Sequence, residues 1–325
     1  MPFLENVLRG KNVPRERMLE VAEHYYHFGG KSPINEQNRQ LVAALADELT
    51  ANGPHLPIYW GNRNWHPMLA DTLRQMKLDG IRYALAFVTS AYSSYSSCRQ
   101  YREDIARAQE AIGEGAPRVD KIRAFYNHPG FIEALVDRVQ HSLAKIPAGR
   151  REAAQLIFTA HSIPVAMAET SDYEKQLIET ARLVGGELGR SEKEWRLVYQ
   201  SRSGPPSQPW LEPDILDCLR QCKSAGGSSD VVIAPIGFVS DHMEVLFDLD
   251  EQARELCAGL GLRMVRAATV GTHPRFISMV RELIVERMDN NQERLALGPL
   301  GPRADACAAD CCPAMKRPEV GFGAR

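Results

Sequence analysis

The stretch LIFTAHSIP, residues 156–164, decides the fold of the chain. In it, a short apolar run of the kind that fills the middle of a β-sheet ends on His161. Apolar runs without polar interruption are typical of strands buried on both faces, as in a parallel sheet covered by helices. Five such runs predict short strands: residues 56–60 (LPIYW), 83–88 (YALAFV), 154–160 (AQLIFTA), 195–200 (WRLVYQ) and 231–238 (VVIAPIGF).

Stretches with helical periodicity lie between and after these runs. NEQNRQLVAALADELT begins near Asn35, DYEKQLIETARLVGGEL begins near Asp172, and PRFISMVRELIVERM covers residues 274–288. Alternation of strands with helices predicts an α/β fold with parallel sheets flanked by helices.

A repeat divides the chain into two halves. PMLADTLRQM (67–76) and PDILDCLRQC (213–222) share Pro, Asp, Leu, Arg and Gln in register, and each follows a strand and an arginine-bearing loop. We expect two similar halves, residues 1–148 and 149–290, although βαβ units that merely look alike would give the same pattern. The repeat places Cys218 and Cys222 at the positions of Thr72 and Met76, which predicts packing in the core rather than metal binding.

The two ends of the chain depart from the repeat. The second half opens with a strand, whereas the first half begins at Met1 inside a helical pattern, so we expect a first strand upstream of the given sequence. Residues 291–325 are rich in Gly, Pro and Ala, which predicts an irregular or disordered tail.

Composition excludes several classes of function. The chain has 325 residues, of which 44% are hydrophobic and 25% charged, and this is the composition of a globular protein. A net charge of -2 gives no basic field for nucleic acid. The sequence has no apolar run long enough for a membrane span and no signal-peptide core, and an odd count of seven cysteines does not suggest a secreted disulfide framework. These features predict a cytoplasmic protein.

Polar residues follow two of the predicted strands. Because ligands gather at the carboxyl ends of parallel strands, His161 and Glu244, which follows the run at 231–238, are candidates for one cleft. A histidine and a glutamate together can bind a borderline divalent cation or move protons. The alternative for His161 is an ordinary hydrogen-bonded side chain at a strand end.

A row of acids follows Glu244. Asp248 lies four residues further along a predicted helix, and Asp250 and Glu251 come close behind. The row can serve as an acidic relay for a cation or for protons, or it can be a solvated helix start where the dipole favours carboxylates.

Two other stretches bear on ligand binding. SAYSSYSSCRQY (90–101) combines hydroxyls, aromatic rings and Arg99, a set that suits a flat aromatic ligand bearing carboxylates. FGGKSPIN (28–35) is rich in glycine but lacks the GxxxxGK[ST] spacing of a P-loop, so it gives weak support for nucleotide binding.

Taken together, these motifs make the sequence similar to the ferrochelatases, which insert ferrous iron into a porphyrin at the end of haem synthesis. The matching segments occur in family order between residues 2 and 288. Their sequences are most similar to those of the coproporphyrin III ferrochelatases of actinobacterial type. They are HYYHFGGKSPINEQN, IYWGNRNWHP, FTAHSIP, YQSRSGPPSQPWLEPD and APIGFVSDHMEVLFDLD. The resemblance implies two Rossmann-like halves of the chelatase type, with the porphyrin in the cleft between them.

The resemblance also assigns roles to residues. It implies that His161 faces the pyrrole nitrogens, that Glu244 lies opposite it, and that both are catalytic and bind iron. Ser32 and Tyr101 match positions that contact the porphyrin. The implied reaction uses Fe(II) as a substrate and needs no redox cofactor or nucleotide.

The implied relay is partly altered in this chain. Asp248 matches the next acid of the family's helix, but Gln252 stands where the family often has another acid, so Glu251 is the alternative member. In relatives the first strand, which we expect upstream of Met1, lines the porphyrin pocket.

Three tail cysteines, Cys307, Cys311 and Cys312, resemble the arrangement by which some ferrochelatases hold a [2Fe-2S] cluster. Such a cluster takes four thiolates. In cluster-bearing relatives a further cysteine follows HSIP, where this chain has Ser171. A fourth ligand could come from Cys98 or Cys257 if the fold brings either close, and otherwise the tail thiols are free.

Three functions remain open at this point. The leading hypothesis is iron insertion into coproporphyrin III, with protoporphyrin IX as the next substrate. A cobalt chelatase of similar fold is the second enzymatic hypothesis, and a non-catalytic haem carrier is the third.

Overall fold

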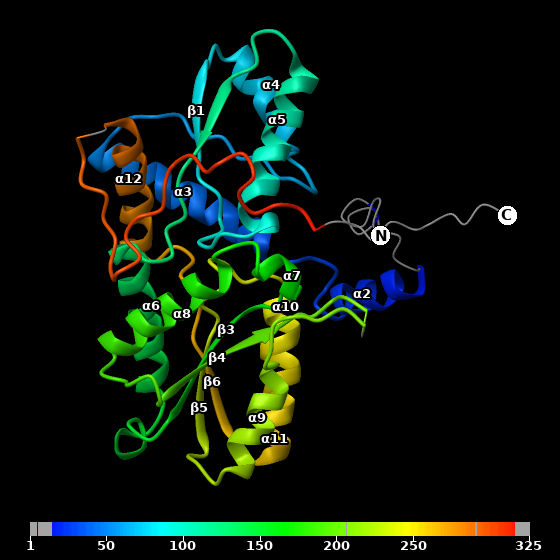
Figure 1. The fold of residues 1–325 in the computed structure, drawn as a ribbon, viewed down its shortest axis with the longest axis vertical. Coiled ribbons are helices and arrows are strands. Elements are labelled where there is room, and N and C mark those ends of the chain that lie inside the picture. Colours follow the sequence, from blue (N-terminus) through cyan, green and yellow to red (C-terminus); the bar gives the residue numbers. More distant parts are fainter. Residues whose placement is uncertain (1–4, 6–14, 206, 290, 316–325) are drawn as a thin grey trace, which may run out of the picture.

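Four parallel strands form the larger of two sheets in the computed structural model, which describes residue 5 and residues 15–205, 207–289 and 291–315. The strand order is β4 (Trp195–Gln200), β3 (Gln155–His161), β5 (Asp230–Ala234) and β6 (Arg263–Arg266). Helices α6 (Pro129–Ala144) and α8 (Tyr173–Glu187) cover one face of this sheet, and α9 (Ile215–Ser224) and α11 (Arg254–Leu260) cover the other (Figure 1).

Alternate side chains of β3 enter two separate cores. Leu156 and Phe158 pack into the core shared with α6 and α8, whereas Ile157 packs into the core shared with α9 and α11. Burial on both faces explains why the strand is apolar throughout. The predicted strands at 154–160 and 195–200 are therefore confirmed within a residue. The run at 231–238 ends as a strand at Ala234, because Pro235 has no N–H to continue the ladder.

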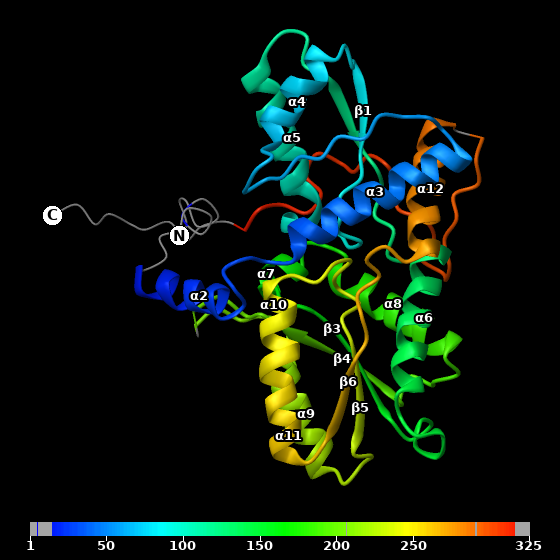
Figure 2. The same ribbon diagram turned by 180° about the vertical axis from the view of Figure 1, so that it is seen from behind.

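The first half carries a smaller sheet at the opposite end of the long axis (Figure 1). It pairs β1 (Tyr83–Ala86) with β2 (Arg118–Lys121) in parallel, and its helices are α3 (Ile34–Asn52), α4 (Leu69–Leu78) and α5 (Gln100–Ile112). The helix α2 (Arg15–His27) projects to one side, as the reverse view in Figure 2 also shows.

The strand predicted at residues 56–60 does not form, and this prediction is wrong. Its counterpart in the second half, β4, is a strand because it bonds along its length to β3. No segment among the described residues offers residues 56–60 such a neighbour. Leu56 and Ile58 instead line a cavity of about 420 Å³ with Leu49 of α3. The strand expected upstream of Met1 stays a prediction.

The repeat and the long helices appear as predicted. The two repeat segments become α4 and α9, each beginning two residues after a cis proline, Pro67 and Pro213. The predicted helices near Asn35 and Asp172 are α3 and α8, and residues 274–288 form α12 (Pro274–Met288). Helix α12 packs against both α3 and α6 and so joins the two halves.

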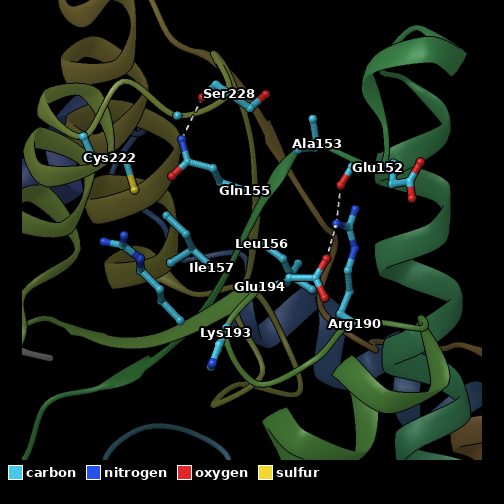
Figure 3. A pocket seen from close by; sticks show the side chains of 14 residues that line it. Glu152, Ala153, Gln155, Leu156, Ile157, Arg190, Lys193, Glu194, Cys222 and Ser228 are labelled. Atoms are coloured by element: carbon cyan, nitrogen blue, oxygen red, sulfur yellow. Dashed lines mark hydrogen bonds and ion pairs between the residues drawn. The ribbon is translucent and has the colours of Figure 1, made fainter.

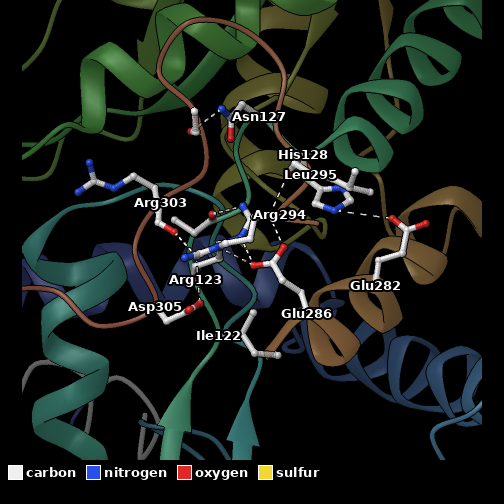
Figure 4. Close-up of polar contacts among 12 residues, drawn as sticks. Ile122, Arg123, Asn127, His128, Glu282, Glu286, Arg294, Leu295, Arg303 and Asp305 are labelled. Atoms are coloured by element: carbon white, nitrogen blue, oxygen red, sulfur yellow. Dashed lines mark hydrogen bonds and ion pairs between the residues drawn. The ribbon is translucent and has the colours of Figure 1, made fainter. Parts of the chain in front are cut away.

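The tail is irregular as expected, but in residues 291–315 it is anchored on the protein (Figure 4). The guanidinium of Arg123, whose side chain is 0% exposed, binds both carboxylate oxygens of Glu286 at 2.7 and 2.8 Å. It also donates to the carbonyl of Leu295 at 2.9 Å. The Asn127 amide donates to the carbonyls of Leu297 and Gly301, each at 3.0 Å. The tail after α12 is thus tied to the segment that precedes α6.

None of the helices in the described part of the chain is long and apolar enough to cross a membrane.

Candidate active site

The imidazole of His161 lies at the carboxyl end of β3 and is held from two sides. Its Nδ1 contacts the carbonyl oxygen of Ser162, and the hydroxyl of Tyr173 donates to the carbonyl of His161 at 3.0 Å. A carbonyl oxygen can only accept, so Nδ1 carries the hydrogen, and Nε2 of the neutral ring holds the lone pair. That nitrogen points toward Glu244.

Glu244 comes to this point through the loop after β5. It lies in the short helix α10 (Met243–Val245), whose start is capped by His242 Nδ1 accepting the N–H of Glu244 at 3.2 Å. Its Oε2 lies 3.6 Å from His161 Nε2 and 3.7 Å from His242 Nδ1. About half of the Glu244 side chain, 51%, is open to solvent.

The structure therefore brings His161 and Glu244 into direct contact. An aromatic ring needs about 3.5 Å of contact distance on each of its faces, so no ring fits within the 3.6 Å between the two groups. The expectation that Glu244 lies opposite His161 across a bound porphyrin stays a prediction.

The contact moves both pKa values. Burial alone would lower the pKa of His161, but the facing Glu244 carboxylate outweighs it and raises that pKa above its ordinary value. Partial burial alone would raise the pKa of Glu244, and the hydrogen bond and charge of His161 bring it below its usual range. Burial lowers the pKa of His242, which keeps this capping ring neutral. The contact thus favours protonated His161 together with ionised Glu244 at the end of β3.

The acids beyond Glu244 lie on a π-helix, η3 (Leu246–Ala253), which continues α10. Burial raises the pKa of Asp248 to about 6, although the hydroxyl of Ser201 donates a short hydrogen bond to its carboxylate. Glu251 lies further along and contacts His27 Nε2 of α2 at 3.0 Å. Asp250 is bound by Arg266 at 2.8 Å and serves the structure rather than a relay.

The two predicted porphyrin contacts, Ser32 and Tyr101, lie in the first half. Ser32 precedes α3, where its Oγ accepts the N–H of Ile34 at 3.4 Å. Tyr101 is in the first turn of α5, with the guanidinium of Arg63 4.3 Å from its ring centre. The loop that carries Glu244 reaches α3 through the Asp241 N–H, which donates to Gln37 at 2.8 Å.

The family of the chain follows from its sequence match. The family model described as Ferrochelatase matches residues 1–288, which is most of the chain. The chain belongs to the ferrochelatase family. These enzymes are porphyrin metal chelatases that insert iron in haem biosynthesis, and the expectation drawn from the HSIP and SDHMEV motifs is confirmed.

Ferrochelatases from several bacteria are similar to this chain along almost its whole length. The ferrochelatase of Rhodopirellula baltica is 60% identical over 324 residues, covering 99% of this chain and 92% of that protein. The coproporphyrin III ferrochelatase of Streptomyces griseus is 51% identical and covers 100% of this chain and 92% of its own. That of Nocardia farcinica is 48% identical, with 98% and 93% covered.

A solved chelatase shares the fold. The sirohydrochlorin chelatase SirB from Bacillus subtilis subspecies spizizenii, in complex with cobalt, matches 79% of this chain and 92% of its own with a TM-score of 0.52. Its sequence identity is 14%, so the match shows the fold alone. The prediction of a chelatase-type α/β fold with helix-flanked parallel sheets is confirmed.

The stretch at residues 90–101 of this ferrochelatase is held mainly by contacts within the protein, and its fit to a flat aromatic ligand stays a prediction. Its serines mostly bond one another and the backbone: Ser94 Oγ accepts the N–H of Ser97 at 3.2 Å and caps the π-helix η1 (Tyr95–Arg99). The Tyr92 hydroxyl donates to the carbonyl of Ile236 at 2.9 Å, and Ser96 contacts Met167 of α7 (Val165–Ala168). These contacts join the first half to the loops that follow β3 and β5.

Three residues near the pair were not predicted as site residues. His242 caps α10 beside Glu244, and its presence in the SDHMEV motif was the available signal. Tyr25 lies near Glu244, whose charge adds to burial in raising the tyrosine pKa to about 12. The hydroxyl of Ser201 donates a hydrogen bond to Asp248. Ser201 has a left-handed backbone conformation, with φ 64°, and no sequence pattern predicts this conformation.

A cavity of about 320 Å³ opens at the other end of β3 (Figure 3). Its lining includes Gln155 and Ile157 of that strand, together with Arg190 and Cys222. His161 is at the carboxyl end of the same strand, so this cavity does not belong to the candidate active site.

The cysteines separate into two groups. Cys218, Cys222 and Cys257 are buried in the core of the second half, which confirms the prediction that the first two pack there. Cys98 of η1 is 5% exposed, and in the tail Cys311 Sγ lies 3.5 Å from Cys312 Sγ.

Proposed function

We propose that this ferrochelatase inserts Fe(II) into coproporphyrin III, using His161 and Glu244 as the groups that take the pyrrole protons and bind the arriving metal. The observation that carries the proposal is the 3.6 Å contact between His161 Nε2 and Glu244 Oε2 at the carboxyl ends of neighbouring strands. The names of relatives at 48–51% identity support coproporphyrin III as the substrate.

Metalation of a free-base porphyrin exchanges two pyrrole protons for one Fe(II). The planar ring resists the exchange, because its N–H bonds and lone pairs lie in the ring plane. A site that holds a puckered ring stabilises the transition state more than the flat substrate. In the neutral form His161 presents the Nε2 lone pair, which can accept a pyrrole proton.

Glu244 and the acids of η3 complete the proposed path. The Glu244 carboxylate is an oxygen ligand that can replace water around iron, and beside His161 it makes a mixed nitrogen and oxygen site suited to Fe(II). Asp248 and Glu251 follow on the same π-helix and lead toward α2. We propose them as the relay that exchanges protons, or hydrated iron, with solvent.

The assignment is tested with anaerobic assays of Fe(II) insertion by His161→Ala and Glu244→Gln. Loss of a general base typically costs about 10²–10⁴-fold in rate, and we expect losses in this range with porphyrin binding retained. His141→Ala is the matched control, since that histidine is 72% exposed on α6. Full activity in His161→Ala would remove the proposed mechanism. Haem binding without turnover by the unaltered chain would favour a carrier instead.

The choice between porphyrins has its own test. Coproporphyrin III carries four carboxylates and protoporphyrin IX two, so coproporphyrin gains more from cationic and hydroxyl groups around the ring. Steady-state kcat/KM on both porphyrins, measured with one enzyme preparation, should favour coproporphyrin III. Equal or greater kcat/KM on protoporphyrin IX would reverse the choice.

We also propose that the protein acts in the cytoplasm. All seven cysteines are free thiols, which suits a reducing compartment. Fractionation of cells that produce the full-length protein tests this, with recovery in the membrane pellet as the contrary result.

A further inference from the structure

Two buried tyrosines hold the backbone segments that carry His161 and Glu244. The hydroxyl of Tyr173, at the start of α8, donates to the carbonyl of His161 at 3.0 Å. The hydroxyl of Tyr92, in the first half, donates at 2.9 Å to the carbonyl of Ile236, in the loop that leads from β5 to Glu244. Each side of the candidate active site is therefore bonded to one tyrosine.

The rings of these two tyrosines pack against each other. Tyr92 and Tyr173 meet edge to face, with ring centres 6.1 Å apart and planes at 81°. This is a favoured geometry for an aromatic pair. The two residues are 2% and 5% exposed, and side chains in a close-packed interior cannot shift independently of their neighbours. The contact between the rings thus fixes the distance between the two carbonyls that the hydroxyls hold.

Hydrogen bonds beside the rings hold the first half on α8. The N–H of Ser93 donates to Gln176 Oε1 at 2.8 Å, and Gln176 Nε2 donates to the hydroxyl of Ser93 at 3.1 Å. Ser93 follows Tyr92 in the chain, and Gln176 lies about one turn after Tyr173 on α8. Both residues of this second contact are buried, so the amide and the hydroxyl depend on each other as partners.

The bond from Tyr173 bears on the position of the imidazole. The planar peptide group between His161 and Ser162 is held at both of its polar atoms, since Tyr173 donates to its oxygen and its N–H donates to the carbonyl of Gln200 at 2.7 Å. The His161 ring is attached to this peptide group, and its Nδ1 contacts the carbonyl of Ser162 on the other side. Loss of the Tyr173 hydroxyl would let the peptide turn and move Nε2 away from Glu244.

The bond from Tyr92 bears on the other loop. Ile236 is 0% exposed, so its carbonyl needs a donor from the protein, and Tyr92 supplies one. Tyr92 belongs to the half that also carries the predicted porphyrin contacts, Ser32 and Tyr101. The half predicted to hold the porphyrin therefore fixes the start of the loop that bears Glu244.

We infer that Tyr92 and Tyr173 are positioning residues for metalation, which keep the loops of His161 and Glu244 at the separation that the reaction needs. The inference rests on the proposed function of that pair. Burial raises the pKa of both phenols far above the ordinary value, so neither tyrosine gives up its proton near neutral pH. Both act through the groups they hold.

The test uses Tyr92→Phe and Tyr173→Phe, which keep the rings and remove only the hydroxyls. A misplacement of about 1 Å at a reacting centre can cost about 100-fold in rate, so we expect kcat for Fe(II) insertion to fall about 10–100-fold, with KM for the porphyrin little changed. Tyr199→Phe is the matched control. Tyr199 is 2% exposed, and its hydroxyl donates at 3.1 Å to Glu174 of α8 rather than to an active-site loop. This variant should lose stability and keep its kcat.

Double-mutant cycles separate positioning from a general loss of structure. If Tyr173 acts through His161, Tyr173→Phe should slow the unaltered enzyme and leave the residual rate of His161→Ala unchanged. In the same way, Tyr92→Phe should leave the residual rate of Glu244→Gln unchanged. A general loss of structure would lower the rate by the same factor in both backgrounds. Near-UV circular dichroism and urea unfolding check that every variant folds.

The outcomes distinguish this inference from the proposed function. Folded tyrosine variants with unchanged kcat would overturn the inference and leave the proposed function standing. Rate losses that multiply fully in both cycles would do the same, since the tyrosines would then act independently of the pair. A rate in His161→Ala equal to that of the unaltered enzyme would overturn the proposed function, and this inference with it.

Discussion

The N–H of Gly237 donates a hydrogen bond of 3.0 Å to the carbonyl of Thr159, so the loop after β5 lies directly against the end of β3. A Cβ atom at residue 237 would come within 2.6 Å of the Cα of Ala160, the residue before His161. The absence of a side chain at Gly237 is what lets the two loops bearing His161 and Glu244 approach each other.

Gly237→Ala should therefore separate the pair. We expect a loss of unfolding free energy of about 1–3 kcal/mol from overpacking, with a larger proportional loss of metalation rate than of porphyrin binding. Urea unfolding and the metalation assay measure the two effects. Gly259→Ala in α11, where an added Cβ meets nothing within 4 Å, is the control and should leave activity unchanged. An unaffected rate in Gly237→Ala would mean that close approach of the loops is not required.

The pH dependence of activity should reveal Asp248. Its pKa is raised to about 6, so the carboxylate that relays protons is lost as the pH falls through that value, and kcat/KM should fall with it. Ser201→Gly removes the hydroxyl that stabilises the ionised form, and glycine tolerates the φ of 64° at this position. A hydrogen bond to a charged group is worth about 1.5–3 kcal/mol, so the acid limb should move up by about one pH unit or more.

The same profile distinguishes Asp248 from His161, whose proton also titrates. Asp248→Asn should remove this acid limb, whereas a limb owed to the His161 pair should remain in both variants. A profile of Ser201→Gly that overlays the unaltered one would assign the limb to another group.

The buried pair of Arg123 and Glu286 should control both stability and the tail. Removing one partner of a buried, hydrogen-bonded ion pair costs about 3–5 kcal/mol, because the other charge stays buried. We expect a loss of this size for Arg123→Met in urea unfolding, with faster proteolysis of the tail that Leu295 anchors. Arg118→Met removes an arginine that is 68% exposed and should cost less than about 1 kcal/mol. Similar losses in the two variants would contradict the importance of burial.

His128 should make the fold sensitive to acid. Burial, aided by Arg123 and Arg275, lowers the pKa of this histidine from 6.5 to about 3, so the folded protein keeps the ring neutral while the unfolded chain protonates it. Stability is then complete above pH 6.5 and is lost as the pH falls toward 3. The expected slope from this group is about 1.4 kcal/mol per pH unit.

His128→Asn is the variant that isolates this effect. The ring of His128 caps α6 by accepting the N–H of Gly130 at 3.2 Å, and asparagine is a good cap that does not titrate. Unfolding free energies measured at several pH values below 6 should give a flatter slope for His128→Asn, while His141→Asn keeps the original slope. If unfolding free energy falls with pH at the same slope in all three proteins, His128 has the same pKa in the folded and unfolded states, which would contradict the prediction.

Much of the second half could be predicted from its sequence, because its strands are apolar on both faces and its helices are long and periodic. The strands β2, with sequence RVDK, and β6, with sequence RMVR, are short and carry charges, so no pattern distinguishes them from loops. Residues 56–60 are the reverse case, a strand that the sequence predicts and the structure lacks. Their composition favours a strand, but a strand also needs a hydrogen-bonded neighbour, and composition carries no information about neighbours.

The sequence singles out the residues of the candidate site but not the contact between them. His161 and Glu244 follow apolar runs, and that position in a parallel sheet is a strong signal. Their direct contact depends on how far the loop after β5 folds back, which a single glycine and its hydrogen bond decide.

The anchoring of the tail has a consequence for biosynthesis. A ribosome delivers the chain from its amino end, and domains generally fold as they emerge. Arg123 and Asn127 belong to the first half, yet they find their partners 163 to 174 residues later, at Glu286, Leu295, Leu297 and Gly301. Until these residues leave the exit tunnel, a buried guanidinium and amide have no partners, so the first half can complete its folding only after residues 286–301 have emerged.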